Sequence, residues 1–410
     1  MKLSRLRWLK HLLYALIALP LVLCAAEVGL RVYDIQTGWF QRQVSDEESL
    51  LVPSPTTFVE LRPMLNRSAE QGDGTAVNTV AVRINSFGLR GAEPAVPKPP
   101  GVYRIVVLGD DAVFGSQLQE NETVPAYLEQ YLQSRSPLDV EVINAGVPEF
   151  CPLLSLLQLR HRLLALQPDL LVLHFDMSDV ADDHRVRRHT NMNAAGLPIA
   201  CSNPAWLAKT SLGNGGLHEQ FLLTHWAAKQ LGTYWSGKTQ STTERDIDSP
   251  LGKYRWLEDN PPNWSIYIQQ ALTPIEQIKT LAEGSYIRLV VSTCPVPWQV
   301  SAKSIRSREV LKVSGLRSRT AVRNRQPFEN LAKLTTKLGV PFCEPSTAFQ
   351  KTEEPHKLFQ KTSPGLTSAG NAFYAREIAA TLIQSVPSVW SQPAVKDRSA
   401  SSPRRVRIPK

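Results

Sequence analysis

The sequence lacks paired cysteines. It has 410 residues, and no two of its five cysteines stand in a CxxC spacing: Cys24, Cys151, Cys201, Cys294 and Cys343. Zinc knuckles and thioredoxin-like redox sites need that spacing, so both classes are excluded. Cys294 and Cys343 each end a strand-like apolar run, and we expect them to be the likeliest disulfide pair if the domain is exported.

Signatures of nucleic-acid binding are also missing. No basic stripe is interleaved with aromatic residues, and no helix-turn-helix, RRM or zinc-finger spacing is present. The formal net charge is +9, but Lys and Arg gather at the two ends of the chain, whereas the interior holds acidic clusters. The sequence therefore predicts no nucleic-acid partner, and its charge indicates membrane topology plus a basic tail.

One long apolar run is present, at the N-terminus. Four basic residues within positions 1–11 precede an apolar stretch that begins at Leu12 and extends toward Val32. This order is typical of an export signal, and the positive-inside rule places the basic end in the cytoplasm. Cleavage after Ala26 and an uncleaved anchor over residues 12–32 both stay open, although the length favours the anchor. We expect a single-pass membrane protein whose large domain lies on the extracytoplasmic, periplasmic side.

The segments on either side of the central domain differ from it in composition. Residues 33–100 hold short strand candidates among many Pro and Gly residues, and we expect a membrane-proximal spacer that packs on the domain. Residues 389–410 combine Ser, Pro and basic side chains without an apolar period. Such a composition predicts a disordered basic tail.

Residues 101–388 alternate short apolar strands with helical stretches. We expect strands at 104–108, 140–143, 170–175, 287–292 and 340–342, and helices at 124–133, 153–166, 274–282, 328–338 and 369–384. Apolar strands separated by helices are typical of a parallel sheet covered on both faces. This predicts an α/β, doubly wound, flavodoxin-like fold with ligand sites beyond the carboxyl ends of the strands. Residues 185–265 break the rhythm, and we expect an insertion or lid there with one helix near 219–231.

Several blocks of this domain resemble the SGNH/GDSL hydrolases. The loop after the first strand, Gly109-Asp110-Asp111-Ala112-Val113-Phe114-Gly115, is similar to the family's GDSxTxG block, and Asn144-Ala145-Gly146 is similar to its second block. INSFGLRG at 84–91 and GVYRIVVLGD at 101–110 resemble the lead-in of membrane-anchored bacterial members. The resemblance covers about residues 80–385 and depends on the order and spacing of these blocks.

Carried over position by position, the resemblance implies a site without its catalytic groups. The nucleophilic serine falls on Asp111, and the glycine that donates to the oxyanion falls on Gly146. The asparagine donor falls on Ser178, while the acid and the histidine of the last block fall on Ser363 and Gly365. A carboxylate at the first position would face the forming oxyanion, and a glycine cannot accept a proton.

Other residues could in principle replace the missing base. His174, His184 and His356 could reach the pocket, but we expect ordinary surface or core roles for all three. Ser116 lies beyond the nucleophile position, in the next turn. An acidic cluster matches no EF-hand spacing and is expected to be a solvated loop: Asp176, Asp179, Asp182 and Asp183. The sequence thus predicts neither a metal nor a cofactor.

The function expected from these observations is binding without catalysis. We expect a membrane-tethered, SGNH hydrolase-like protein that binds an acyl or glycan ligand, or a protein partner, at the cell envelope. An active esterase or O-acetyltransferase on envelope polysaccharide is the alternative, and a histidine within reach of Asp111 would favour it. A purely structural envelope protein is the third hypothesis, favoured by a filled apolar site. The oligomeric state stays open.

Overall fold

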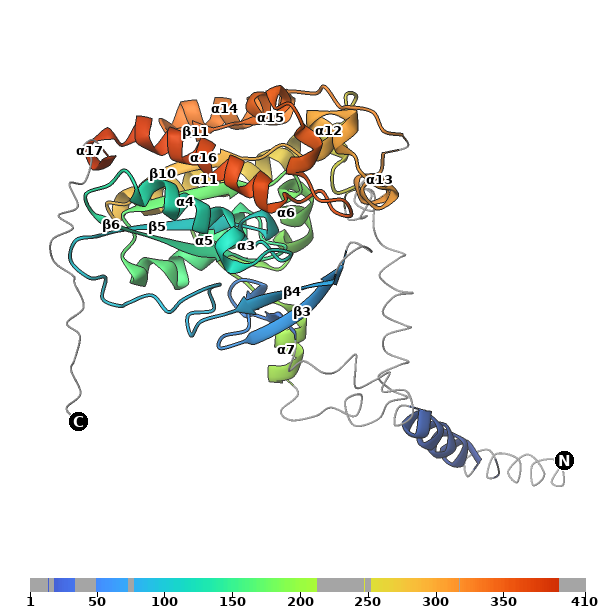
Figure 1. Ribbon diagram of the computed structural model, residues 1–410. Helices are drawn as coiled ribbons and strands as arrows, with labels where there is room; N and C mark the ends of the chain where they lie inside the picture. The colour runs from blue at the N-terminus through green and yellow to red at the C-terminus, as the bar shows by residue number, and fades with distance from the viewer. Residues whose placement is uncertain are drawn as a thin grey trace, which may run out of the picture.

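The protein is built around a five-stranded parallel sheet (Figure 1). The computed structural model describes residues 14, 18–33, 49–72, 77–211, 247, 252–316 and 318–390. The strands of the sheet are β5 (Val102–Gly109), β6 (Asp139–Gly146), β7 (Leu170–Phe175), β10 (Arg288–Thr293) and β11 (Phe342–Cys343). They pair in the order β11-β10-β7-β5-β6, and every pairing is parallel. Counted along the chain this is the 2-1-3-4-5 order of flavodoxin-like sheets, so the predicted α/β fold is confirmed.

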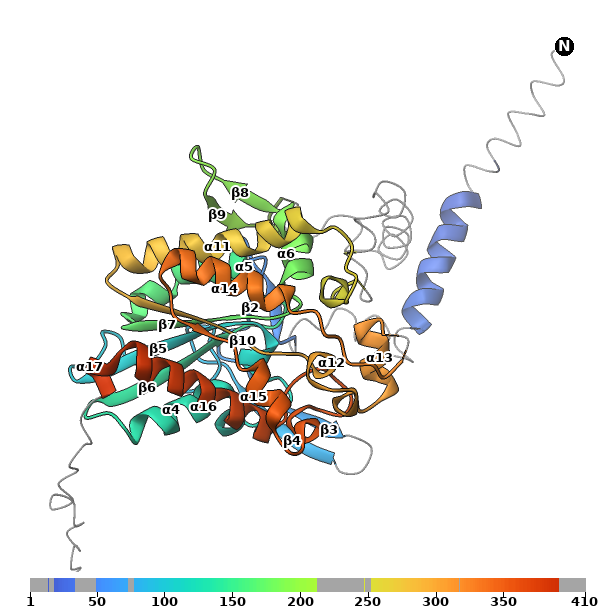
Figure 2. The same cartoon turned by 90° about the horizontal axis from the view of Figure 1, so that it is seen from above.

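Helices cover both faces of the sheet, as the view from above shows (Figure 2). One face carries α4 (Val124–Gln133) and α16 (Ser368–Ser385), and the other carries α5 (Pro152–His161), α11 (Ser265–Gly284) and α14 (Gln326–Leu338). Along β5, Ile105 and Val107 pack in the core under α4 and α16, whereas Val106 and Leu108 pack in the core under α5 and α11. Alternate residues of a strand point to opposite faces, so a strand covered on both faces is apolar throughout.

Helix α11 is longer than the sequence predicts. The expected helix began at Pro274, whereas α11 begins at Ser265 and contains Pro274 in its interior. A proline in this position removes the hydrogen bond to the carbonyl four residues earlier, here that of Gln270. That carbonyl instead accepts a hydrogen bond from Nη2 of Arg187 at 2.7 Å. A contact between distant segments therefore compensates for the proline, and no local pattern reveals it.

The segment before β5 packs against the loop that follows β5. It forms two antiparallel pairs, β1 (Leu51–Pro53) with β2 (Val59–Leu61) and β3 (Asn66–Gly72) with β4 (Val77–Arg83). Leu61 and Ile84 share a buried apolar cluster with Phe114. The guanidinium of Arg90 donates to the carbonyls of Phe114 and Gly115 at 2.7 and 2.6 Å. These contacts hold the turn after β5 in a fixed position.

The stretch expected to form an insertion, residues 185–265, is described in part. Helix α6 (Asp179–Arg187) runs into it, followed by a hairpin of β8 (Thr190–Met192) and β9 (Pro198–Cys201) and by α7 (Pro204–Ser211). The helix expected near 219–231 lies outside the described residues, as do residues 391–410 of the expected tail. Beyond the single described residue 247, the description resumes at Gly252, and the next two residues, Lys253 and Tyr254, line a cavity.

Near the N-terminus, residues 18–33 are helical. Across the described ranges, no helix combines the length and the apolar character that crossing a bilayer requires. Residues 12, 13 and 15–17 of the expected anchor lie outside those ranges.

The expected disulfide between Cys294 and Cys343 is wrong. Both residues carry free, buried thiols. In the parallel pairing of β10 with β11, Cys343 lies opposite Ser292 rather than opposite Cys294, so the two cysteines are offset along the strands. Burial raises the pKa of Cys343 to about 12. The two apolar runs form the neighbouring strands β10 and β11, but their register does not place the two cysteines opposite each other. A disulfide needs its two cysteines to lie that close.

Candidate functional site

A cavity of about 260 Å³ opens at the carboxyl ends of β5, β7 and β10. Four of the five residues predicted for the site line it: Asp111, Ser178, Ser363 and Gly365. Polar residues that the sequence did not single out also line it, namely Lys253, Tyr254, Gln360 and Asn371. The fifth predicted residue, Gly146, does not line the cavity. The structure therefore brings together residues separated by about 250 positions, at the edge where doubly wound sheets bind ligands.

Gly146 holds the scaffold of the site together. A Cβ at this position would lie 2.4 Å from the backbone nitrogen of Phe114, so only glycine allows β6 to approach α3 (Asp111–Phe114) this closely. The N–H of Gly146 donates to Oδ1 of Asn144 at 3.0 Å. The resemblance gives the N–H of Gly146 the role of donating to an oxyanion. In the structure this N–H donates to the side chain of Asn144.

The turn after β5 presents two adjacent carboxylates. Asp110 is buried and caps α3, because its Oδ1 accepts a hydrogen bond from the N–H of Ala112 at 3.0 Å. Burial, followed by repulsion from Asp176 and Asp111, raises the pKa of Asp110 well above its ordinary value. Asp111 reaches solvent in the cavity and accepts a hydrogen bond from the hydroxyl of Ser116. Desolvation raises the pKa of Asp111, and the Ser116 hydrogen bond opposes that rise.

The turn between β7 and α6 is built from two hydrogen bonds, each from a backbone N–H to an aspartate side chain. The N–H of Ser178 donates to Oδ1 of Asp176 at 2.7 Å, and the N–H of Asp176 donates to Oδ2 of Asp179 at 3.0 Å. Burial acts to raise the pKa of Asp176, but the neighbouring His174 and Ser178 lower it overall. The resemblance assigns Ser178 to an oxyanion donor, and the structure places it on the cavity wall at the start of α6.

The expectation that the acidic cluster is a solvated loop is wrong for three of its four members. Asp179, Asp182 and Asp183 lie in α6 and are at most 5% exposed. Oδ2 of Asp182 lies 3.0 Å from Nζ of Lys253, and Asp183 accepts hydrogen bonds from Arg187 at 2.6 and 2.7 Å. Buried charges of this kind persist because partners neutralise them. The partner of Asp183 lies one turn further along α6, whereas Lys253, the partner of Asp182, comes from a distant part of the chain.

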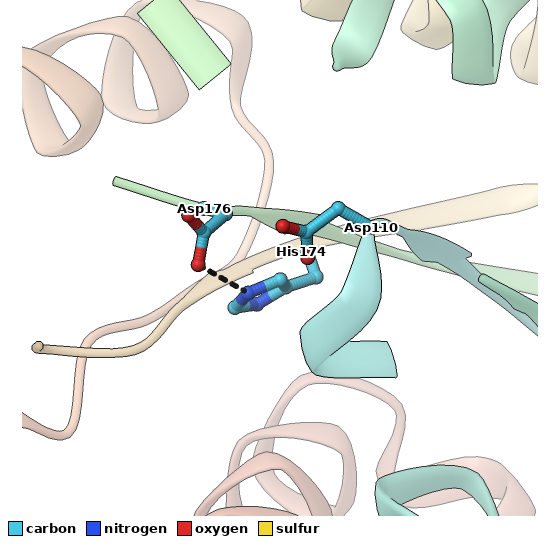
Figure 3. Close-up of side chains that lie close together, drawn as sticks. All are labelled: Asp110, His174 and Asp176. Carbon is cyan, nitrogen blue, oxygen red and sulfur yellow. Dashed lines mark ion pairs between the residues drawn. The ribbon is translucent and has the colours of Figure 1, made fainter. Parts of the chain in front are cut away.

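His174 lies in the core beside the cavity. It belongs to β7 and is 2% exposed, and its Nδ1 lies 2.8 Å from the hydroxyl of Tyr374 in α16. Its Nε2 faces Oδ2 of Asp176 across 3.8 Å, with Asp110 on the same side, as Figure 3 shows. One ligand atom from each of Asp110, His174 and Asp176 lies within 4.8 Å of the others. The sequence offered a weak signal for this group, because the histidine and Asp176 are two positions apart at a strand end.

Ser363 and Gly365, to which the resemblance assigns an acid and a histidine, take part in hydrogen bonds that shape the cavity wall. Oγ of Ser363 donates to Oε1 of Gln360 at 2.7 Å, and the N–H of Gly365 donates to Oγ of Ser363 at 3.3 Å. Nε2 of Gln360 donates to the carbonyl of Leu366 at 2.9 Å. Ser363 and Gly365 therefore shape the cavity wall, and neither supplies a titratable side chain.

The remaining candidate bases stand elsewhere. His184 lies in α6, where its ring meets that of Tyr267 edge to face at 4.8 Å, and His356 lies in the turn Pro355–Leu358. No histidine is present among the described residues that line the cavity. Lys253 could not be found from the sequence, because no motif surrounds it there. Burial acts to lower the pKa of Lys253, and Asp182 raises it overall.

A larger cavity, of about 670 Å³, lies between α11 and α14. None of the residues predicted for the site lines it, and its charged lining residues are Glu276, Lys333 and Lys337. The smaller cavity is the better candidate site because it holds the convergent polar side chains and lies at the carboxyl ends of the strands.

Comparison with known proteins gives structural similarity alone. No family model matches the sequence, and no curated protein matches it. Among solved structures, the chain is similar to a protein of the G-D-S-L family from Desulfitobacterium hafniense DCB-2, with 11% identity and a TM-score of 0.36 over 68% of this chain and 99% of the other. The lipase/acylhydrolase from Enterococcus faecalis gives 12% and 0.35, over 69% and 96%. The acetylxylan esterase Axe2 from Geobacillus stearothermophilus, as a catalytic mutant, gives 10% and 0.36, over 68% and 94%. Similarity at this level carries no argument about activity.

Proposed function

We propose that this chain binds a hydroxyl-rich ligand, an acylated or plain glycan, in the cavity at the carboxyl ends of β5, β7 and β10, and does not hydrolyse it. The observation that carries the proposal is a carboxylate in the cavity, at the position to which the SGNH/GDSL resemblance assigns a nucleophilic serine. Asp111 stands there next to the buried Asp110, and Asp176 lines the same cavity.

The three carboxylates that line the cavity, Asp110, Asp111 and Asp176, disfavour ester hydrolysis. Attack on an ester places negative charge on the carbonyl oxygen, and enzymes lower that barrier with fixed N–H and O–H donors. Here the N–H of Gly146 already donates to Asn144. Charges of the same sign repel one another strongly in a site of low dielectric constant, so Asp110, Asp111 and Asp176 would raise the barrier.

The same carboxylates can bind a ligand rich in hydroxyl groups. Carboxylates are strong hydrogen-bond acceptors, and hydroxyls are donors that carry no charge. Lys253, Gln360 and Asn371 add donors on the cavity wall. The volume of about 260 Å³ lies near the lower end of ligand pockets, about 300–1,000 Å³, which supports a ligand of one or two rings.

We further propose that the chain is tethered to a membrane by residues 12–32, with the cavity on the outer side of that membrane. The basic residues at positions 2, 5, 7 and 10, followed by the apolar run from Leu12, support this proposal. Protease added to intact spheroplasts and to broken ones would test it. Cleavage of the chain in intact spheroplasts supports the proposal, and protection until the membrane is broken contradicts it.

Calorimetric titration tests the binding proposal. Acetylated cello-oligosaccharides, and the same oligosaccharides after alkaline deacetylation, would be titrated into the purified full-length chain. Asp111→Ala should weaken binding by about 10-fold or more, because a hydrogen bond to a charged group is worth about 1.5–3 kcal/mol. Asp139→Asn is the matched control, since Asp139 is exposed at the opposite end of β6. Equal affinities for Asp111→Ala and the unchanged chain would contradict the proposal.

A second candidate function is ester hydrolysis by a rearranged site, and one observation favours it. The hydroxyl of Ser116 lines the cavity and donates to the carboxylate of Asp111. In this candidate Oγ of Ser116 attacks the acyl carbon while its proton passes to Asp111, and Asp111 then gives that proton to the departing alcohol, which leaves an acyl ester on Ser116. Water next attacks this ester and loses a proton to Asp111, and the acid leaves as Ser116 takes the proton back. Loss of turnover in Ser116→Ala would distinguish this function from binding alone.

A further inference from the structure

The buried nitrogen Nε2 of His174 lacks a hydrogen bond. His174 is 2% exposed, and no group among the described residues lies within hydrogen-bonding distance of this atom. The other ring nitrogen, Nδ1, lies 2.8 Å from the hydroxyl of Tyr374. If Nδ1 carries the proton and donates to Tyr374, Nε2 presents a lone pair. Histidines that bind metals are held in this way, with the far nitrogen donating to a neighbouring group.

Two carboxylates face the same point. Asp110 and Asp176 flank the imidazole of His174 in Figure 3, and one ligand atom of each lies within 4.8 Å of the others. In each carboxylate one oxygen is held by a backbone N–H. Oδ1 of Asp110 accepts from Ala112, and Oδ1 of Asp176 accepts from Ser178. Oδ2 of Asp176 is the atom that faces Nε2 of His174 at 3.8 Å. The backbone therefore fixes both carboxylates while leaving an oxygen of each for another partner.

The charge around this point is strongly negative. Asp110, Asp111 and Asp176 line the cavity, and Asp179 and Asp182 lie buried behind it. Among the described lining residues Lys253 is the only cation, and its Nζ lies 3.0 Å from Oδ2 of Asp182. Asp182 is thus paired with Lys253 and, at 3.5 Å, with Nη2 of Arg185. The described residues that line the cavity offer no second cation to Asp110, Asp111 and Asp176, so a further cation would be attracted here.

We propose that Asp110, His174 and Asp176 bind a divalent transition-metal cation, with Zn²⁺ held more tightly than Mn²⁺. One imidazole and two carboxylates are ligands that both ions accept, whereas Mg²⁺ and Ca²⁺ prefer sites made of oxygen alone. The order of the two ions follows the general rise in affinity along the first transition row. Three protein ligands leave a position open toward the cavity for water or for a ligand hydroxyl. The metal site does not depend on glycan binding and goes beyond the proposed function.

Direct titration tests the metal site. The full-length chain, purified without a histidine tag and dialysed against a chelator, would be titrated calorimetrically with ZnCl₂ and with MnCl₂. We expect one ion per chain and a clearly smaller Kd for Zn²⁺. Each of Asp110→Asn, His174→Gln and Asp176→Asn should weaken binding by more than about 100-fold, since even a residue behind a ligand contributes about 10–100-fold. The matched controls His356→Gln and Asp139→Asn should leave the Kd unchanged, because neither residue belongs to the group of three or lines the cavity.

Two further measurements keep the proposal open to refutation if a variant fails to fold. Co²⁺ added to the unchanged protein should give visible absorption bands of a site with nitrogen and oxygen ligands, and Zn²⁺ should abolish them. Tyr374→Phe, which removes only the hydroxyl that positions His174, should weaken Zn²⁺ binding by about 10–100-fold. Absence of binding at millimolar Zn²⁺, or equal affinity in the folded cluster variants and the controls, would overturn the proposal. Either result leaves the glycan titration unaffected, so the two proposals fail separately.

Discussion

The hydroxyl of Ser116 donates a hydrogen bond to the carboxylate of Asp111 at the mouth of the cavity. Asp111 is the residue to which the sequence resemblance assigns the role of a nucleophile. Desolvation raises the pKa of Asp111, and the Ser116 hydrogen bond opposes that rise. A carboxylate held in this way can accept hydrogen bonds from a ligand, which agrees with the binding function proposed above.

Replacement of Gly146 by alanine should destabilise the fold. The added Cβ would lie 2.4 Å from the nitrogen of Phe114 and 2.8 Å from Cβ of Val113, so β6 or α3 must move. Such overpacking costs about 1–3 kcal/mol in the free energy of unfolding. Urea unfolding of Gly146→Ala would measure the loss. Gly284→Ala is the control, because, apart from the adjacent residues and the backbone of its own helix, no heavy atom lies within 4 Å of a Cβ at that position. A Gly146→Ala variant as stable as this control would refute the close approach of the two elements.

Replacement of Arg187 by methionine should also destabilise the protein strongly. Arg187 neutralises the buried Asp183 and donates to the carbonyl of Gln270 that Pro274 leaves free. Removing one partner of a buried ion pair costs about 3–5 kcal/mol, because the remaining charge stays buried. Thermal and urea unfolding of Arg187→Met would measure this cost. Arg188→Met, at the exposed neighbouring position, should unfold like the unchanged chain. Equal stability of both variants would contradict the proposed role of Arg187.

The buried thiols should react slowly with alkylating reagents in the native protein. Burial raises the pKa of Cys343 to about 12 and that of Cys201 to about 11. At pH 8 a thiol with a pKa near 12 is ionised in roughly one molecule in 10⁴, and the thiolate is the reactive form. Mass spectrometry after brief treatment of the native chain with iodoacetamide should find Cys151, Cys201, Cys294 and Cys343 unmodified, because all four are buried. Denatured protein, without a reductant, should show all five modified, whereas a disulfide between Cys294 and Cys343 would leave three.

The sequence predicted the sheet well because each strand carries its own signal. The six residues of β7 are all buried, and the strand has the predicted bounds, Leu170–Phe175. The turn after β5 was placed correctly for the same reason, since an apolar strand followed by glycine marks its end. The fold could thus be derived from patterns that span fewer than ten residues.

Contacts between distant segments could not be predicted in this way. The extension of α11 past Pro274 depends on Arg187, which is 83 positions from the carbonyl that it binds. The buried Asp182 is paired with Lys253, which lies 71 positions further along the chain. Likewise, the pairing of His174 with Tyr374 joins residues 200 positions apart. Single positions of this kind carry no periodicity or motif, so the part of the site that they build becomes visible only in three dimensions.

The most direct test of the central claim is an assay of ester hydrolysis. The purified full-length chain, Asp111→Ala and Ser116→Ala would be compared on p-nitrophenyl acetate, p-nitrophenyl butyrate and acetylated cello-oligosaccharides. We predict that all three proteins release acid at the same background rate, because the cavity holds carboxylates where a nucleophile and an oxyanion would have to stand. Turnover that disappears in Asp111→Ala or in Ser116→Ala would contradict this account and establish a rearranged hydrolase.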